Sequence, residues 1–191
     1  TEAGDFAVKI PLIGEHNIYN ALAATAVGLA FDMEIADIQK GIESVKAVRG
    51  RGYCIECGDI TVLDDAYNAN PVSVKSAIDV LSVETGRTVA ILGDMGELGD
   101  DERAMHREVG EHLGKEKIPV LFTVGELALE YARGARHENP SVSCKSFETK
   151  EDLYPVLKRD LRPGDTVLVK ASHFMGFEEI VGFLEESFGQ E

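Results

Sequence analysis

Residues 64–71, DDAYNANP, concentrate hydrogen-bonding side chains directly after the apolar run ITVL at 60–63. The polar members of this segment are two adjacent acids, a tyrosine and two asparagines: Asp64, Asp65, Tyr67, Asn68 and Asn70. An asparagine before Pro71 is a typical helix N-cap, and Asn and Asp are ordinary turn residues. Turn formation alone does not explain the tyrosine, the first asparagine and both acids together. The segment is therefore a candidate binding loop for a ligand with several polar groups.

Two further polar or glycine-rich segments follow apolar runs, GDMGELG at 93–99 and KASHFMG at 170–176. The acids of the first, Asp94 and Glu97 among them, would repel a bare phosphate and suit an ammonium group. Alternatively, the segment 93–99 is only a tight turn, and Asp100, directly after it, caps the next helix. The second segment combines the three polar side chains Lys170, Ser172 and His173, although a single histidine there is more often a surface residue.

Several kinds of site are not supported by the sequence. It contains no G-x-x-x-x-G-K-[ST] phosphate loop and no Ser-His-Asp spacing. Cys54 and Cys57 lie three apart on a predicted strand, hence on opposite faces, and no second cysteine pair or nearby histidine completes a metal site. We expect these cysteines to pack in the core, His106 and His112 to be solvated on a helix, and no metal site within the chain.

From residue 53 onward, strand patterns alternate with helix patterns. The predicted strands are 53–57, 60–63, 88–92, 120–124, 142–147 and 166–170, and the predicted helices are 71–84, 100–115, 126–135, 149–161 and 177–187. Gly58-Asp59 is a hairpin signal between the first two strands. This order predicts an α/β fold, a Rossmann-like, doubly wound, mostly parallel sheet with helices on both faces. In such sheets ligands bind at the carboxyl ends of the strands, where the three polar segments lie.

The first part of the chain has a different pattern. Helices are predicted at 17–31 and 34–45, before a basic, glycine-punctuated stretch at 46–52 that we interpret as a linker and hinge. Residues 6–10, FAVKI, alternate like a strand although no initiator Met precedes them. We therefore expect the chain to be a piece of a longer protein.

Composition excludes several partners. The 191 residues carry 34 acids against 19 Lys and Arg, a net charge of -15, which argues against a nucleic-acid or anionic-membrane surface. No apolar run is long enough to span a membrane. Three cysteines without a signal peptide favour a reducing, cytoplasmic setting.

Four segments together resemble one family. Residues 14–24, GEHNIYNALAA, resemble the G-x-H-N-x-x-N-x-L-A-A helix of the Mur ligases, the ATP-dependent enzymes that build the peptidoglycan stem peptide. Gly50-Arg51 followed by Asp64-Asp65 resembles their crossover between domains and the strand after it. The segment 167–173, VLVKASH, resembles V-L-V-K-G-S-R, with Ala171 and His173 in place of glycine and arginine. DDAYNANP and LGDMGELG are similar to the branch that adds D-alanyl-D-alanine to UDP-N-acetylmuramoyl-tripeptide.

The resemblance implies a three-domain enzyme. Residues 1–46 would be the helical, carboxy-terminal tail of the central ATP-binding domain, and 47–191 the carboxy-terminal Rossmann-like ligase domain. It also implies a cytoplasmic, monomeric ligase of peptidoglycan precursor synthesis, in which ATP and Mg²⁺ are bound mainly by domains outside this chain. The fragment alone would be inactive, because the phosphate loop is missing.

The same resemblance assigns roles to residues. Arg51 would contact an ATP phosphate and act in catalysis. Asn17, Asn20 and Asp65 would bind the rest of ATP. The D-Ala-D-Ala pocket would contain Tyr67, Asn68, Asn70 and Ser172. Five further candidates for the site are His16, Asp64, Asp94, Glu97 and Lys170.

Two alternatives stay open. One is another amide-forming ligase, of the Mur or folylpolyglutamate type, against which DAYNANP weighs. The other is a non-catalytic module that binds a nucleotide or metabolite, because the fold alone does not determine the function. The helical first 45 residues argue against the second alternative, since a free-standing module would not need them.

Overall fold

The computed structural model describes residues 4–189, and the chain divides into two compact units, Thr1–Val48 and Arg49–Glu191. Each unit is described by itself below. Within residues 4–189, no helix is both long and apolar enough to cross a membrane.

The first unit is a pair of helices, α1 (His16–Ala30) and α2 (Ile35–Glu43). A Cβ on Gly28 of α1 would lie 2.8 Å from the Ile38 side chain of α2, so glycine permits this close approach. The predicted strand at 6–10 is wrong, because residues 4–11 have no regular secondary structure. Two hydrogen bonds to α2 hold this segment instead, from Lys9 N to Glu43 Oε1 (3.2 Å) and from Gln39 Nε2 to the Ala7 carbonyl (3.0 Å).

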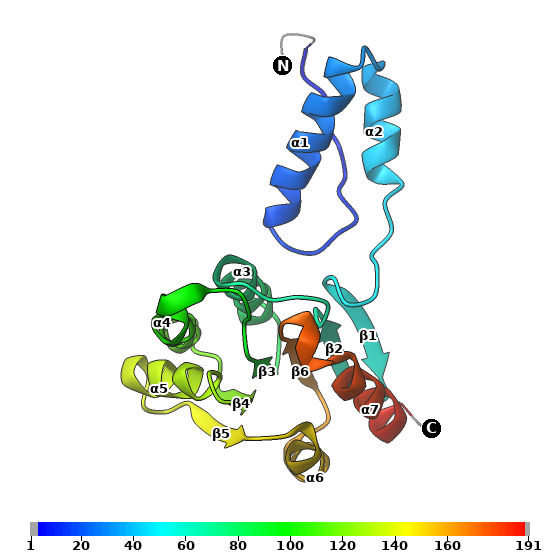
Figure 1. Ribbon diagram of the computed structural model, residues 1–191. Coiled ribbons are helices and arrows are strands. Elements are labelled where there is room, and N and C mark those ends of the chain that lie inside the picture. Colours follow the sequence, from blue (N-terminus) through cyan, green and yellow to red (C-terminus); the bar gives the residue numbers. More distant parts are fainter. Residues whose placement is uncertain (1–3, 190–191) are drawn as a thin grey trace. The chain divides into compact units, whose positions relative to one another are not determined.

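The second unit is built on a six-stranded sheet with the order β1-β2-β6-β3-β4-β5 (Figure 1). Its strands are β1 (Tyr53–Cys57), β2 (Ile60–Asp64), β3 (Arg87–Gly93), β4 (Val120–Val124), β5 (Ser143–Phe147) and β6 (Asp165–Lys170). The first two strands form the predicted antiparallel hairpin, in which Gly58 adopts a φ of 56°. All other neighbours pair in parallel. Cys57 of β1 is buried, whereas Cys54 is exposed, so only the former packs in the core.

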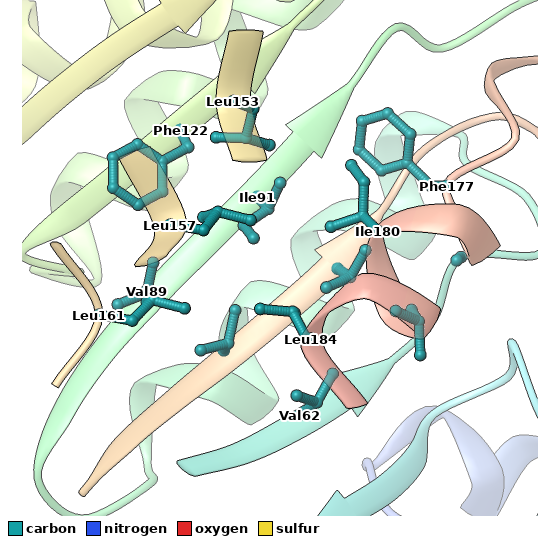
Figure 2. Close-up of a cluster of buried hydrophobic side chains, with 14 of the residues drawn as sticks. Val62, Val89, Ile91, Phe122, Leu153, Leu157, Leu161, Phe177, Ile180 and Leu184 are labelled. Atoms are coloured by element: carbon teal, nitrogen blue, oxygen red, sulfur yellow. The ribbon is translucent and has the colours of Figure 1, made fainter. Parts of the chain in front are cut away.

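Five helices cover the two faces of this sheet. They are α3 (Pro71–Ser82), α4 (Glu102–Lys115), α5 (Leu129–Glu138), α6 (Lys150–Asp160) and α7 (Glu178–Phe188). The first three pack on one face, where Ile78, Leu113 and Tyr131 belong to one buried cluster. The last two cover the other face through side chains such as Leu157 and Ile180 (Figure 2). The predicted doubly wound α/β fold is confirmed.

Strand order decides which loops meet. From β2 the chain crosses to β3 and continues outward through β4 and β5. It then returns under the opposite face, and β6 enters the sheet between β2 and β3. Because parallel strands end at the same edge, the loop after β6 lies between the turn after β2 and the loop after β3. These are the three polar segments identified in the sequence.

The helix starts at this edge match the sequence in part. Asn70 is the N-cap of α3: its side chain accepts from Ser73 N at 2.9 Å, and Ser73 Oγ accepts from Asn70 N at 3.1 Å. The predicted cap by Asp100 is wrong. Residues Gly99–Asp101 form a short 3₁₀ turn, and α4 follows without a side-chain cap.

Candidate functional site

The two acids of the turn after β2 hold the segment that precedes β1. Asp64 is buried, and its Oδ2 accepts from Gly50 N at 2.8 Å. Asp65 Oδ1 accepts from Gly52 N at 3.1 Å. One carboxylate is therefore bonded on each side of Arg51. We call Asp64, Asp65, Gly50 and Gly52 the carboxylate clamp.

Backbone geometry gives Arg51 an outward position within this clamp. Gly50 and Gly52 have φ of 78° and 63°, in the left-handed region that side chains disfavour. The Arg51 guanidinium carbon lies 4.0 Å from the centroid of the Tyr67 ring, and Tyr67 N donates to the Gly50 carbonyl at 3.0 Å. Across residues 4–189, no ion pair engages the Arg51 guanidinium. Its N–H groups are thus oriented by an aromatic ring and remain available to a phosphate.

Lys170, at the end of β6, holds the turn after β2 from its buried side. Its buried ammonium lies 2.5 Å from Asp65 Oδ2 and donates to the Asn68 carbonyl at 2.9 Å. Burial lowers the pKa of Lys170, and the Asp65 carboxylate opposes that effect. Because these acceptors already use its donors, Lys170 supports the turn rather than facing a ligand.

Ser172 joins all three loops. Its hydroxyl accepts from Gly96 N at 2.8 Å and donates to the Ala69 carbonyl at 3.3 Å. Its own N–H donates to the Asp94 carbonyl at 3.1 Å. Ser172 is only 4% exposed. The contacts of this hydroxyl are thus internal, between the turn after β2 and the loop after β3.

Several side chains of this edge are exposed together. Tyr67, Asn68 and Asn70 face solvent from the turn, and the His173 ring lies 5.4 Å from the Tyr67 ring. Asn70 also serves as the N-cap described above. Phe174, 70% exposed, lies over Gly96, where a Cβ would approach its ring within 2.8 Å. An exposed phenylalanine next to a glycine is a ligand-contact candidate that the sequence pattern did not single out.

A hollow of about 240 Å³ opens beside Tyr67 and His173, toward α7. Its other lining residues are Arg49, Gly50, Asp64, Ala66, Glu178, Val181, Gly182 and Glu185. Arg49 forms a two-pronged ion pair with Glu185, with both N–O distances at 2.8 Å. Since Asp64 is also bonded to Gly50, the hollow offers a polar ligand fewer free groups than the exposed edge does.

The acids of the loop after β3 differ in environment. Asp94 Oδ1 accepts from Ala128 N at 2.6 Å. A Cβ on Gly125 would lie 2.4 Å from that oxygen, so the close approach requires glycine. Glu97 is exposed, with φ of 61°. Asp94 is therefore tied to the segment before α5, and Glu97 is the member available to a ligand.

The polar candidates of the first unit cluster at the start of α1. Asn20 Nδ2 donates to Asn17 Oδ1 at 3.0 Å, and Asn17 Nδ2 donates to the Ile13 carbonyl at 2.7 Å. His16 Nε2 lies 3.2 Å from Asn17 Nδ2. These three side chains thus form one local hydrogen-bonded group.

One set of side chains among the described residues has the spacing of a metal site. The ligand atoms of Asp79, His112 and Glu116 lie within 4.8 Å of one another. They lie at the carboxyl-terminal ends of α3 and α4, with Glu116 directly after α4, whereas the helix starts face the edge described above. The group is therefore separate from the candidate site, and His112 is bonded to Asp79 at 2.6 Å.

Comparison with known proteins identifies the family. The model of the Mur ligase, glutamate ligase domain matches residues 50–173, which contain the carboxylate clamp, the turn after β2, the loop after β3 and the first residues of the loop after β6. The UDP-N-acetylmuramoyl-tripeptide–D-alanyl-D-alanine ligase of Bacillus subtilis is 39% identical over 181 residues, covering 93% of this chain and 40% of that protein. A crystal structure of MurF from Acinetobacter baumannii matches with a TM-score of 0.83 and 34% identity, over 94% of this chain and 40% of that one.

A third protein, MurF ligase from Thermotoga maritima in complex with ADP, has a TM-score of 0.80 over 96% of this chain and 41% of that chain. At 24% identity it shows the fold alone. The chain thus spans about 40% of the length of these three relatives. Because the family model matches residues 50–173, more than half of the chain, the chain belongs to the Mur ligase family.

Proposed function

We propose that this chain is part of an ATP-dependent ligase that joins D-alanyl-D-alanine to UDP-N-acetylmuramoyl-tripeptide. Residues 1–46 would complete the central ATP-binding domain, and 47–191 would form the carboxy-terminal domain. The Bacillus subtilis relative of that name supports the choice of substrates. Three free cysteines fit a reducing cytoplasm, and a monomeric state stays a prediction.

The proposed reaction has two steps. A carboxylate oxygen of the tripeptide attacks the γ-phosphorus of ATP, ADP leaves, and an acyl phosphate forms. The amine of D-Ala-D-Ala then attacks the carbonyl carbon, the carbon–oxygen bond to phosphate breaks, and the amine loses a proton. Phosphoryl transfer depends mainly on positioning and charge neutralisation, which is the contribution expected from this domain.

The carboxylate clamp is the observation that carries this proposal. Its two acids fix the backbone on both sides of Arg51, and the Tyr67 ring lies against the guanidinium at 4.0 Å. A guanidinium held in this way can stabilise the charge that develops on phosphate oxygens without first being ordered. Arg51 is therefore assigned to an ATP phosphate.

Further residues are assigned to the rest of ATP. Asp65, partly exposed, keeps lone pairs that can accept from the ribose hydroxyls, and Asn17 and Asn20 are assigned to the adenine side. A MurF ligase of the same fold, from Thermotoga maritima, is known in complex with ADP. Mg²⁺ would neutralise the phosphates, and its ligands are assigned mainly to the parts of the enzyme outside this chain.

The dipeptide is assigned to the exposed edge. Tyr67, Asn68 and Asn70 offer neutral donors and acceptors to a carboxylate and a peptide group. The internal bonds of Ser172 favour an indirect role, in which it holds these three in place. Glu97 is the exposed acid suited to the incoming ammonium group.

Phosphate release by the complete protein tests the proposal. Mg-ATP and UDP-N-acetylmuramoyl-tripeptide would be supplied with D-Ala-D-Ala, D-Glu or a diamino acid in separate reactions. We expect release that depends on D-Ala-D-Ala. Dependence on another amine would favour a different Mur ligase, and no release with any amine would favour the non-catalytic binding module.

A further inference from the structure

His106 of α4 is a fully buried histidine to which the proposed reaction assigns no role. The expectation that it is solvated is wrong, because its exposed fraction is 0%. Its Nε2 lies 2.8 Å from Met95 N, and its Nδ1 lies 2.6 Å from the Glu102 carbonyl oxygen. A backbone N–H can only donate and a carbonyl can only accept. His106 is therefore neutral, with its proton on Nδ1 and a lone pair on Nε2.

Protonation of Nε2 would destroy this arrangement. It would bring two N–H groups face to face and leave the buried Met95 N–H without an acceptor, which is costly in a protein interior. The ionisable groups that face His106 are Asp94 of the loop, Glu102 on its own helix, and Glu130 and Tyr131 on α5. Burial outweighs the neighbouring acids and lowers the pKa of His106 below its ordinary value of 6.5.

The loop that His106 holds is connected to the exposed edge by a continuous chain of hydrogen bonds. Met95 is followed by Gly96, whose N–H donates to Ser172 Oγ, and preceded by Asp94, whose carbonyl accepts from Ser172 N. The Ser172 hydroxyl in turn donates to the Ala69 carbonyl. Ala69 lies between Asn68 and Asn70, the two asparagines assigned to the dipeptide.

We propose that His106 is a positioning residue for the incoming dipeptide. As a neutral acceptor it holds the loop after β3 against Ser172 and so keeps the turn of Tyr67, Asn68 and Asn70 in its binding geometry. This role rests on the proposed function. It implies that dipeptide binding weakens on acidification, when His106 gains a proton, while the ATP contacts of Arg51 and Asp65 are retained.

The sign of the pH effect follows from the lowered pKa. Well above pH 6.5 His106 is neutral in both the folded and the unfolded chain, and its contribution to the stability of the folded chain is fully present. As the pH falls below 6.5, the unfolded chain takes up the proton first. The contribution of His106 is therefore lost as the pH falls toward and through the pKa of the folded state. A pKa raised above 6.5 would have the opposite effect.

Nitrogen-15 NMR of the histidines in the 191-residue chain tests the hydrogen-bond assignment without any variant or substrate. We expect the His106 signals of the Nδ1–H tautomer at neutral pH, with a pKa below 6.5. Below that pKa, the amides of Met95 and Gly96 should lose protection, measured as their exchange rates relative to the intrinsic rates at the same pH. The proposal would be overturned by an Nε2–H tautomer, by a pKa at or above 6.5, or by amide protection of Met95 and Gly96 that stays the same when His106 is protonated.

Kinetics of the complete protein test the consequence for the dipeptide. His106→Phe keeps a ring but removes the acceptor, and should raise the KM for D-Ala-D-Ala about tenfold, while the KM for ATP stays within about twofold. His106→Gln provides a carbonyl oxygen that does not titrate, so it should restore much of the lost affinity and abolish the rise in KM at acidic pH. His112→Gln, on the same helix, is the matched control and should leave both KM values near wild type.

The outcomes separate the two claims. An unchanged dipeptide KM in folded His106→Phe, or an unchanged acidic rise in folded His106→Gln, would overturn the positioning role. If neither variant folds, the NMR titration decides. If the complete protein ligates no amine, the proposed function fails, and the NMR result still shows whether His106 holds the loop.

Discussion

At the scale of single residues, the candidate site consists of buried side chains that hold the backbone and exposed side chains that can contact a ligand. Asp64, Lys170 and Ser172 are all at most 4% exposed, and their side chains are bonded to the backbone or, for Lys170, also to the Asp65 carboxylate. Arg51, Tyr67, Asn68 and Asn70 are exposed at the same edge. The buried group therefore determines geometry, and the exposed group is available to ligands.

Replacing Arg51 tests the exposed group. Arg51→Ala in the complete protein should lower kcat by about 100-fold or more, as expected when a preorganised charge at the transition state is lost. Initial rates of phosphate release at saturating substrates measure the effect. Arg49→Ala, which removes an exposed ion pair to Glu185, is the control and should keep kcat within about threefold. Near-normal turnover by Arg51→Ala would contradict its role.

Replacing Asp64 tests the buried group. In Asp64→Asn one acceptor oxygen becomes a donor, which leaves either Gly50 N or Ala66 N without its bond. The free energy of unfolding should fall by about 1–3 kcal/mol. Urea unfolding of the 191-residue chain measures this change, with Asp100→Asn on the exposed surface as control. Equal stability of the two variants would show that the clamp contributes little.

At the scale of elements, strand order creates the site. Propensity and alternation predicted the strands and most helices, and with them the edge at which the three polar loops lie. They did not predict that β6 enters between β2 and β3, because this order results from long-range packing of helices on both faces. The bonds of Ser172 to two different loops follow from that order and could not be read from the sequence.

Local patterns also misled in a physically understandable way. His106 stands in the polar stretch ERAMHRE of α4, which is typical of a solvent-facing helix. Folding of the loop after β3 over that part of the helix buries the ring, and only tertiary structure reveals it. The N-cap at Asn70 depends on neighbouring residues alone, and it was predicted correctly.

Asn70 combines an observed cap with a proposed ligand contact, and two substitutions separate these roles. Asn70→Ser keeps a capping oxygen, so the unfolding free energy should stay within about 0.5 kcal/mol, whereas Asn70→Ala should lose about 1 kcal/mol. Both remove the amide and should raise the KM for D-Ala-D-Ala in the complete protein. A wild-type KM in Asn70→Ser would limit this residue to capping α3.

At the scale of the whole molecule, the division between the two units falls at Val48–Arg49. The stretch 46–52 is predicted to be a hinge, yet its second half is bonded through Gly50 N to Asp64 and through Gly52 N to Asp65. Amide exchange of the 191-residue chain should therefore be fast at 46–48 and slow at these two glycines. Uniform protection across 46–52 would contradict a hinge.

The central claim is that this edge belongs to a ligase that selects D-Ala-D-Ala. The most direct measurement is a competition, in which the complete protein receives Mg-ATP, UDP-N-acetylmuramoyl-tripeptide and equal amounts of D-Ala-D-Ala, D-Glu and a diamino acid, and mass spectrometry identifies the product. The account predicts one new product, the tripeptide extended by D-Ala-D-Ala. A product that contains another amine, or no product while ATP is bound, would contradict it.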